Sequence, residues 1–229
     1  MKKLKHKLGV IYWKTVGKLK NWTYRFNRTF NHIKIWVRGW FCRHRWGIVG
    51  REKVQSIVVC AHPDDETIFF SSILKSKKPF VVCASNRGHK VRKEEFEKAL
   101  AFWGVEGIML NFPDVPGLTF VWRWRMAAKL KKIRNKLPSV TTVYTHSASG
   151  ESGHPHHYAV SNGVEKAFEG CRIITTAVAV PEKGDGRLAA LAVEEKYSAI
   201  KTCYPSQINM LEKWCSWWES YLSTEYFEE

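Results

Sequence analysis

The sequence predicts an α/β fold, a Rossmann-like and largely parallel sheet with helices on both of its faces. Short apolar runs of the length of buried strands alternate along the chain with longer segments of helical periodicity. This alternation starts only near Gln55, after a basic stretch of a different character. We therefore divide the chain into an extension, residues 1–50, and a domain, residues 51–229.

Five apolar segments of the domain have the composition of buried strands. The expected strands are 56–61, 79–85, 107–112, 141–146 and 173–180. The expected helices are 66–75, 91–102, 118–136, 157–168, 194–203 and 208–221, whereas 188–193 fits a strand or a helix. Because a helix separates each strand from the next, the sheet is expected to be largely parallel.

The extension is strongly basic, with 13 Lys and Arg residues and no Asp or Glu among residues 1–50. Its apolar residues recur at steps of three and four, which predicts an amphipathic helical segment, and we expect two helices with a break near Thr23 or Asn27. This apolar face consists of Tyr12, Val16, Leu19, Phe26, Phe30, Ile33, Val37 and Trp40.

Aromatic residues interleaved with cations are typical of a helix that lies in the plane of a membrane surface, and cations attract anionic lipid. We therefore expect residues 1–50 to contact an anionic membrane. Two alternatives remain, packing of the apolar face on the domain and binding of nucleic acid. Nucleic acid is the least favoured partner, because the chain contains no nucleic-acid-binding motif.

The six cysteines show no C-x-x-C spacing, which favours free thiols, mostly buried, in a reducing compartment. No segment approaches the roughly 20 apolar residues that span a bilayer. We expect a cytoplasmic protein, peripheral on the inner face of a membrane.

Polar clusters follow two of the expected strands, AHPDDE at 61–66 and GHPHH at 153–157. In an open parallel sheet, ligands bind beyond the carboxyl ends of the strands, so we expect these clusters to meet. Two histidines and one carboxylate are a common ligand set for catalytic zinc. We expect Zn²⁺, or another divalent transition metal, rather than Ca²⁺ or Mg²⁺.

The two adjacent aspartates suggest a division of roles. One would bind the metal, and the other would accept a proton from the water nucleophile. A nearby histidinium would then stabilise the oxyanion and protonate the leaving amine. The pattern predicts the hydrolysis of an amide.

AHPDDE after an apolar strand, with GHP-x-H about 90 residues later, resembles the PIG-L / LmbE-like family of metal-dependent N-deacetylases. Further features keep the order of that family: R-x-x-E-x-x-x-A-x-x-x-x-G over 92–104, NFPD at 111–114, Lys196, and YPSQ at 204–207. The resemblance covers about 54–210. It implies removal of the N-acetyl group from an N-acetylglucosamine-type amino sugar, here on a lipid-linked or membrane-near glycoconjugate.

The resemblance also implies roles for single residues. The metal ligands would be His62, Asp65 and His157, and the general base would be Asp64. His154 would stabilise the oxyanion or act as the acid, and Arg92 and Asp114 would bind the substrate. Glu66 is expected to favour the helix N-terminus. His89 and His146 hold no motif position, and we expect them to be ordinary loop or core residues.

The chain departs from the usual GHPDH pattern of the family at His156. A carboxylate that orients a metal ligand would therefore be missing or supplied elsewhere. His156 also competes with His157 as the third ligand, although the register of the motif favours His157. Ser152 stands where some relatives have Tyr. These departures leave open an alternative, a catalytically weak, metal-dependent module that binds glycans or lipids.

Overall fold

The computed structural model of the chain describes residues 2–41, 53–151, 153–176, 188–190, 195–209 and 225–228. Within these residues, seven strands form one sheet in the order β3-β2-β1-β4-β5-β7-β6. The strands are β1 (Ser56–Cys60), β2 (Phe80–Ser85), β3 (Gly107–Phe112), β4 (Thr142–Thr145), β5 (Arg172–Thr176), β6 (Leu188–Ala190) and β7 (Glu225–Glu228). Strands β1 to β5 are parallel, and β7 runs antiparallel to β5 and β6.

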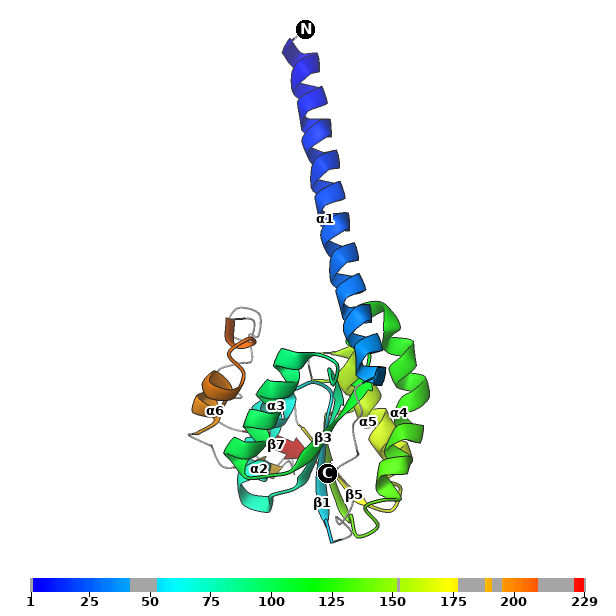
Figure 1. Ribbon diagram of the computed structural model, residues 1–229, viewed down its shortest axis with the longest axis vertical. Helices are drawn as coiled ribbons and strands as arrows, with labels where there is room; N and C mark the ends of the chain where they lie inside the picture. The colour runs from blue at the N-terminus through cyan, green and yellow to red at the C-terminus, as the bar shows by residue number, and fades with distance from the viewer. Residues whose placement is uncertain are drawn as a thin grey trace.

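Helices cover both faces of this sheet (Figure 1). One face carries α2 (Asp65–Lys77), α3 (Lys90–Trp103) and α6 (Glu195–Cys203), and the other carries α4 (Thr119–Arg134) and α5 (Pro155–Ala167). A single 3-10 turn, η1 (Pro116–Leu118), leads into α4. The arrangement confirms the predicted α/β fold.

The central strand β1 illustrates how the sheet divides the core. Ile57 and Val59 pack with α4 and α5, whereas Val58 and Cys60 pack with α2, α3 and α6. Side chains of a strand alternate between the two faces, so a run that is apolar at every position must be covered on both. All four of these side chains are fully buried.

The expected strands and helices agree with the observed ones to within about two residues at most ends. Residues 188–190 are a strand, which resolves the ambiguity of that segment. The expected helix 208–221 and the end of the strand 173–180 lie largely outside the described residues. Cys60, Cys83, Cys171 and Cys203 are free thiols, and three of the four are buried as expected.

The extension is one continuous helix, α1 (Lys2–Phe41), which projects from the domain (Figure 1). The expected break near Thr23 or Asn27 is therefore wrong. Residues such as Thr and Asn cost a helix no more than about 0.7 kcal/mol relative to Ala, and sharp breaks need Pro or a comparable defect. No helix in the described parts of the chain is both long and apolar enough to cross a membrane.

The last turns of α1 dock against the domain beside β3. The indole of Trp36 donates to the carbonyl of Asn111 at 3.0 Å, and the Asn111 amide donates to the carbonyl of Trp36 at 2.8 Å. Arg87 donates to the carbonyl of Gly39 at 2.5 Å. The backbones approach so closely that a Cβ at Gly88 would collide with the carbonyl oxygen of Ile35. A glycine is needed there for space.

The apolar face expected from the sequence does not make this contact. Its described members remain exposed to solvent, and we name them the apolar stripe: Phe26, Phe30, Ile33, Val37 and Trp40. Helix α1 turns a neighbouring face, with His32, Ile35, Trp36 and Gly39, toward the domain. The domain therefore leaves most of the apolar stripe exposed, and Trp40 also lines a pocket shared with the domain.

Candidate metal centre and active site

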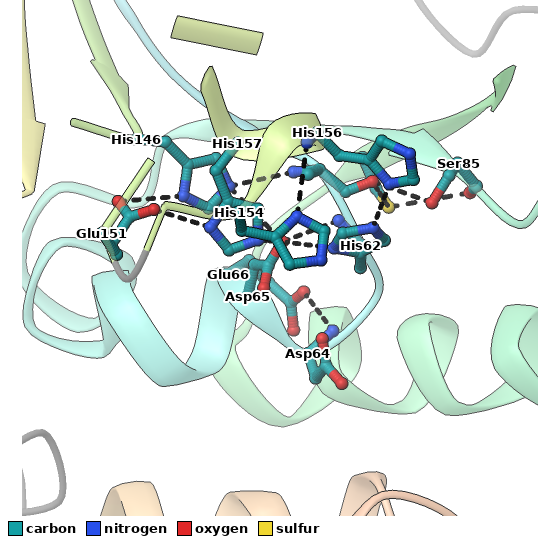
Figure 2. A network of polar contacts seen from close by, with 12 residues as sticks. His62, Asp64, Asp65, Glu66, Ser85, His146, Glu151, His154, His156 and His157 are labelled. Atoms are coloured by element: carbon teal, nitrogen blue, oxygen red, sulfur yellow. Dashed lines mark hydrogen bonds and ion pairs between the residues drawn. The ribbon is translucent and has the colours of Figure 1, made fainter. Parts of the chain in front are cut away.

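The two polar clusters meet where the chain order of the sheet reverses. Strands β1 and β4 are neighbours, although β2 and β3 lie between them in sequence. His62 and Asp65 follow β1, and His146 follows β4 (Figure 2). In open parallel sheets this reversal, at the carboxyl ends of the two strands, is the usual ligand site.

Asp65 is the centre of the cluster. Its Oδ2 lies 3.3 Å from Nδ1 of His62, 3.4 Å from Nε2 of His157 and 3.4 Å from Nε2 of His146. The backbone N–H of His62 also donates to this oxygen at 2.7 Å. Burial opposes the ionisation of Asp65, but the imidazoles of His157, His146 and His62 hold its pKa well below the usual range. Asp65 is a carboxylate at neutral pH.

The donor atoms of His62, Asp65 and His157 fit a metal ion. They lie within 4.8 Å of one another. Ligands at the bond lengths of tetrahedral zinc are separated by about 3.3 Å, and two of the separations here are 3.3 and 3.4 Å. The set of one carboxylate and two imidazoles is also the chemistry that zinc prefers. These residues can hold a divalent metal.

The histidines of the second cluster begin helix α5. His154 is its N-cap, Pro155 occupies the first turn, and His156 and His157 follow in the same turn. Proline is favoured at the start of a helix because its fixed backbone angle suits the first turn. A helix that starts here directs its first turn of imidazoles toward Asp65 and His62 (Figure 2).

Glu151 is the carboxylate that the GHPHH pattern left unaccounted for. Its Oε2 lies 2.6 Å from Nδ1 of His157, and its Oε1 lies 3.2 Å from Nδ1 of His146. Oε1 also accepts from the backbone N–H of Ser147 at 3.0 Å and from the hydroxyl of Thr176. Despite burial, His146 and His157 lower the pKa of Glu151. An ionised Glu151 fixes a proton on Nδ1 of His157, so that Nε2 is free to bind a metal.

His146 is therefore part of the site, contrary to the expectation that it is an ordinary loop or core residue. It is fully buried, its ring stacks on that of His157 at 3.8 Å, and it bridges Asp65 and Glu151. Its place directly after a strand next to β1 is the signal that could have identified it. Glu151 carried no such signal, because its loop has no regular periodicity.

His156 lies at the edge of the cluster toward helix α4. Its ring stacks on Trp122 with 4.1 Å between ring centroids and 4° between planes. Its Nδ1 lies 3.0 Å from Nε2 of His62. His62, His154 and His156 form a second group whose donor atoms are close enough for a metal, so both candidates for the third ligand lie near His62. His157 has the carboxylate partner that metal-binding histidines typically have.

The neutral form of His154 has its proton on Nε2. Its Nδ1 accepts the backbone N–H of His156 at 3.3 Å, so this nitrogen carries a lone pair. Burial, together with His62 and His157, lowers the pKa of His154 to about 3. In this arrangement the ring is neutral at pH 7 and can donate one hydrogen bond from Nε2. The expected histidinium is not the form that this geometry favours.

Asp64 differs sharply from its neighbour Asp65. Its φ of 121° lies in a region that L residues rarely adopt, at the N-cap of α2. Its carboxylate accepts from Arg92 at 2.8 Å and lies apart from the imidazole rings in Figure 2. Burial raises the pKa of Asp64 to about 7, although the Arg92 cation opposes this shift. A carboxyl group of this kind can exchange a proton near neutral pH.

Arg92 is buried and connects three parts of the site. Besides Asp64, it donates to Oε2 of Glu95 at 2.8 Å and to the carbonyl of Pro63. Glu95 in turn accepts from the backbone N–H and the hydroxyl of Ser206 at 2.9 and 2.8 Å. The R-x-x-E helix and the YPSQ segment are thus joined through carboxylate hydrogen bonds. Arg92 contacts the general-base candidate directly.

Glu66 and Lys196 support the turn that carries the aspartates. Glu66 is fully buried and accepts from the hydroxyls of Tyr204 at 2.5 Å and Thr67 at 2.7 Å, and from the backbone N–H of Asp64 at 3.1 Å. The ammonium of Lys196, also buried, donates to the carbonyl of Ile68 at 2.9 Å. Glu66 thus contacts the backbone at the start of α2, as expected, and Lys196 contacts the first turn of the same helix.

Asp114 lies at the solvent-facing rim. Its Oδ1 is 3.8 Å from Nε2 of His62 and 3.8 Å from Nδ1 of His156, and its Oδ2 accepts from the Asn86 amide at 3.1 Å. Among the site carboxylates it is the most exposed, with 34% of its side chain accessible. His32, Ile35 and Trp36 of α1 line the small cavity beside it. Ser152 lies outside the described residues.

Comparison with known families identifies the part of the chain that builds this site. The family model of PIG-L, described as GlcNAc-PI de-N-acetylase, matches residues 57–168. Residues 57–168 are a PIG-L family domain. The predicted resemblance is confirmed for this segment, which includes His62, Asp65 and His157. Helix α1 lies outside the match.

Two curated relatives of this PIG-L domain are N-acetylglucosaminyl-phosphatidylinositol de-N-acetylases. The probable enzyme of Dictyostelium discoideum is 28% identical over 132 residues, which cover 51% of this chain and 50% of the relative. The enzyme of Bos taurus is 27% identical over 143 residues, covering 53% and 55%. The chain therefore spans about half of the length of the curated relatives that it matches.

Among solved structures, the PIG-L domain resembles the zinc-inhibited form of the teicoplanin deacetylase Orf2. The TM-score is 0.61 at 14% sequence identity, and the match covers 76% of this chain and 96% of that structure. At this level of identity, the similarity establishes a shared fold. It extends the common architecture well beyond residues 57–168.

Proposed function

We propose that this chain is a metal-dependent hydrolase that removes the N-acetyl group from an N-acetylglucosamine-type amino sugar. The main support is the donor set of His62, Asp65 and His157, whose separations suit a tetrahedral divalent ion. The named activity of the PIG-L relatives supports the same reaction. The contacts of Arg92 with Asp64 and of Tyr204, in the YPSQ segment, with Glu66 also agree with it.

We infer that the metal is Zn²⁺, held by His62, Asp65 and His157. Such an ion would lower the pKa of water and polarise the amide carbonyl. Glu151 would orient His157 through the 2.6 Å contact to Nδ1, and His146 would hold Glu151 and Asp65 in place. A ligand set that is already arranged loses little conformational entropy when the ion binds.

Asp64 is the proposed general base. With a pKa raised to about 7, it is basic enough to take a proton from the water nucleophile and acidic enough to release it to the leaving amine. Arg92 is better described as a positioning residue than as a contact to the sugar, because it is buried and holds Asp64 and Glu95. A small rotation of the Asp64 carboxylate toward the metal ligands would accompany substrate binding.

His154 is proposed to donate a hydrogen bond from Nε2 to the oxyanion that forms when the amide carbonyl is attacked. This role needs a neutral ring with its proton on Nε2, which is the tautomer that the contact to His156 favours. Asp114, at the exposed rim, would accept a hydrogen bond from a sugar hydroxyl. Metal binding, proton transfer by Asp64, stabilisation of the oxyanion by His154 and sugar binding by Asp114 together account for the proposed amide hydrolysis.

The apolar stripe supports a substrate that is lipid-linked or close to a membrane. It exposes two phenylalanines and a tryptophan on a helix that has cations and no carboxylate. Such a helix binds in the interfacial plane of an anionic bilayer. We propose that α1 places the domain on the cytoplasmic side of a membrane. The alternative of a binding module without turnover loses one of its reasons, because Glu151 supplies the carboxylate that GHPHH lacks.

The test is release of acetate from N-acetylglucosamine, N-acetylglucosamine 1-phosphate and lipid-linked N-acetylglucosamine, with metal content measured on the same sample. We expect about one zinc per chain, turnover that is lost on chelation, and recovery when zinc is restored. Glu195→Gln, which changes an exposed carboxylate far from the site, is the control. Tight metal binding without acetate release from any of the three substrates would contradict the proposal.

A further inference from the structure

Next to the site, helices α1 and α4 enclose a pocket of about 460 Å³ that the proposed mechanism does not use. Trp36 and Trp40 of α1 form one wall, and Trp124 of α4 contributes to the opposite wall. The floor is β3 and the residue after it, with Asn111, Phe112 and Pro113. Because α1 supplies a wall, this pocket is a feature of the extension and the domain together.

The charged side chains that line the pocket are all cationic. Arg87, Arg125, Lys129 and Lys132 line it, and none of its described lining residues is acidic. The cations influence one another, since burial and the charges of Arg87, Lys132 and Arg125 lower the pKa of Lys129. Cations gathered in a partly desolvated hollow attract an anion, which would relieve their mutual repulsion.

The pocket is adjacent to the catalytic rim. It shares Trp36, Asn111 and Phe112 with a smaller cavity, and that cavity is also lined by Asn86 and Asp114. Asp114 lies 3.8 Å from His62. The two cavities are thus neighbours, and a substituent of a sugar bound at the metal ligands would have to pass the small cavity beside Asp114 to reach the four cations.

We propose that this pocket binds a phosphate group carried by the N-acetylated amino sugar, and that α1 is thereby part of the substrate site. The inference rests on the proposed deacetylation. Four cations suit the several oxygens of a phosphate, and guanidinium groups bind phosphate in a bidentate manner. The tryptophan walls accommodate the group attached to the other side of the phosphate. A neutral sugar would gain little from such a lining.

The experiment compares kcat/KM of the zinc-loaded full chain for N-acetylglucosamine 1-phosphate and for N-acetylglucosamine. We expect the phosphorylated sugar to be preferred by about tenfold or more. The double variant Arg125→Gln/Lys132→Gln should lower this preference about tenfold. Both side chains are on the solvent side of α4, so the variant is expected to fold. An added arm with phospholipid-linked N-acetylglucosamine distinguishes a phosphate recognised alone from one recognised within a lipid.

The matched control is Arg123→Gln/Lys131→Gln, which removes the same charge from exposed positions of α4 that do not line the pocket. The preference should stay at the wild-type value in this control. An equal loss in both double variants, or no preference in the wild type, would overturn the proposal, because a general electrostatic field would then suffice.

Direct binding separates this inference from the proposed reaction. Titration calorimetry of N-acetylglucosamine 1-phosphate into the Asp64→Asn chain needs no turnover. We expect binding that Arg125→Gln/Lys132→Gln weakens about tenfold and that Arg123→Gln/Lys131→Gln leaves unchanged. If acetate release fails but this pattern holds, the reaction is wrong and the phosphate pocket stands. If acetate is released but the pattern is absent, only the pocket is wrong.

Discussion

The site and helix α1 differ in how their side chains are satisfied by the rest of the protein. At the site, three buried carboxylates have charged or polar partners: Asp65 has three imidazoles, Asp64 has Arg92, and Glu151 has two histidines and the Ser147 backbone. On α1, the apolar stripe is largely exposed to solvent, and of its members Trp40 also lines a pocket shared with the domain. The first region is arranged before any ligand arrives, whereas the second has surface whose burial requires another molecule.

This difference indicates which region is sensitive to which change. A charge removed from the site leaves a buried partner without compensation, so metal binding and turnover should respond strongly. A side chain removed from the stripe costs only the apolar area that would leave water on association. Variants of the two regions should therefore differ in size of effect and in the property that changes.

The largest effect is expected from Asp65→Ala. It removes the central carboxylate of the ligand set and leaves three imidazoles around an empty position. We expect loss of bound zinc and acetate release below detection, measured by elemental analysis and by coupled acetate assay. Circular dichroism serves as the folding control. Full metal content in this variant would show that the ligands lie elsewhere, for example at His62, His154 and His156.

Asp64→Asn should separate the two aspartates. The amide cannot accept the proton, so kcat should fall about 10²–10⁴-fold while zinc content is retained. The measurement is steady-state turnover together with metal content. Retention of wild-type kcat would remove Asp64 from the role of base, and loss of the metal would mean that both aspartates are ligands.

Glu151→Gln tests the residue that the sequence motif did not identify. Without the carboxylate, His157 loses the partner that fixes its tautomer, and zinc affinity should fall about 10–100-fold. Competition with a chromophoric chelator measures the affinity. The control is Glu165→Gln, an exposed glutamate of the same region on helix α5. Equal affinities of the two variants would assign the orienting role to another group.

The smallest effect is expected on α1. Phe26→Ser should reduce binding of the full chain to vesicles that contain anionic phospholipid by about tenfold, because an apolar ring no longer enters the interface. Tyr24→Ser, an exposed aromatic outside the apolar stripe, should change binding much less. Sedimentation of the vesicles measures both. If the two variants bind alike, the stripe has another partner.

Much of the fold could be predicted because its signals are local. Strands β1 to β5 are short apolar runs, and helices follow each of the first four, so the alternation was sufficient for a parallel sheet. The break expected in α1 is absent, because residues of weak helix propensity such as Thr23 and Asn27 cost a helix only a small free energy. The partner face of α1 depends on Gly88 and Asn111, which are distant in sequence.

The site could be predicted only where a motif or a strand end marked it. His62 and Asp65 follow β1, and the PIG-L motif register indicated His157. His146 was missed because a single histidine after a strand is usually structural. The contacts of Glu151 and the pairing of Arg92 with Asp64 form only when loops and helices distant in sequence come together. Periodicity contains no information about such contacts.

The length of α1 has a consequence for where the proposed active site can lie. At 1.5 Å per residue, its 40 residues extend about 60 Å from end to end. The hydrogen bonds described above between α1 and the domain lie in the last turns of the helix, at Trp36 and Gly39. If only the amino end of α1 were held at a surface, the domain could move through a wide arc. Contact along the whole helix would instead keep the proposed active site at one fixed height above that surface. The way in which α1 is held would therefore set either how far the proposed site moves or how high above the surface it stays.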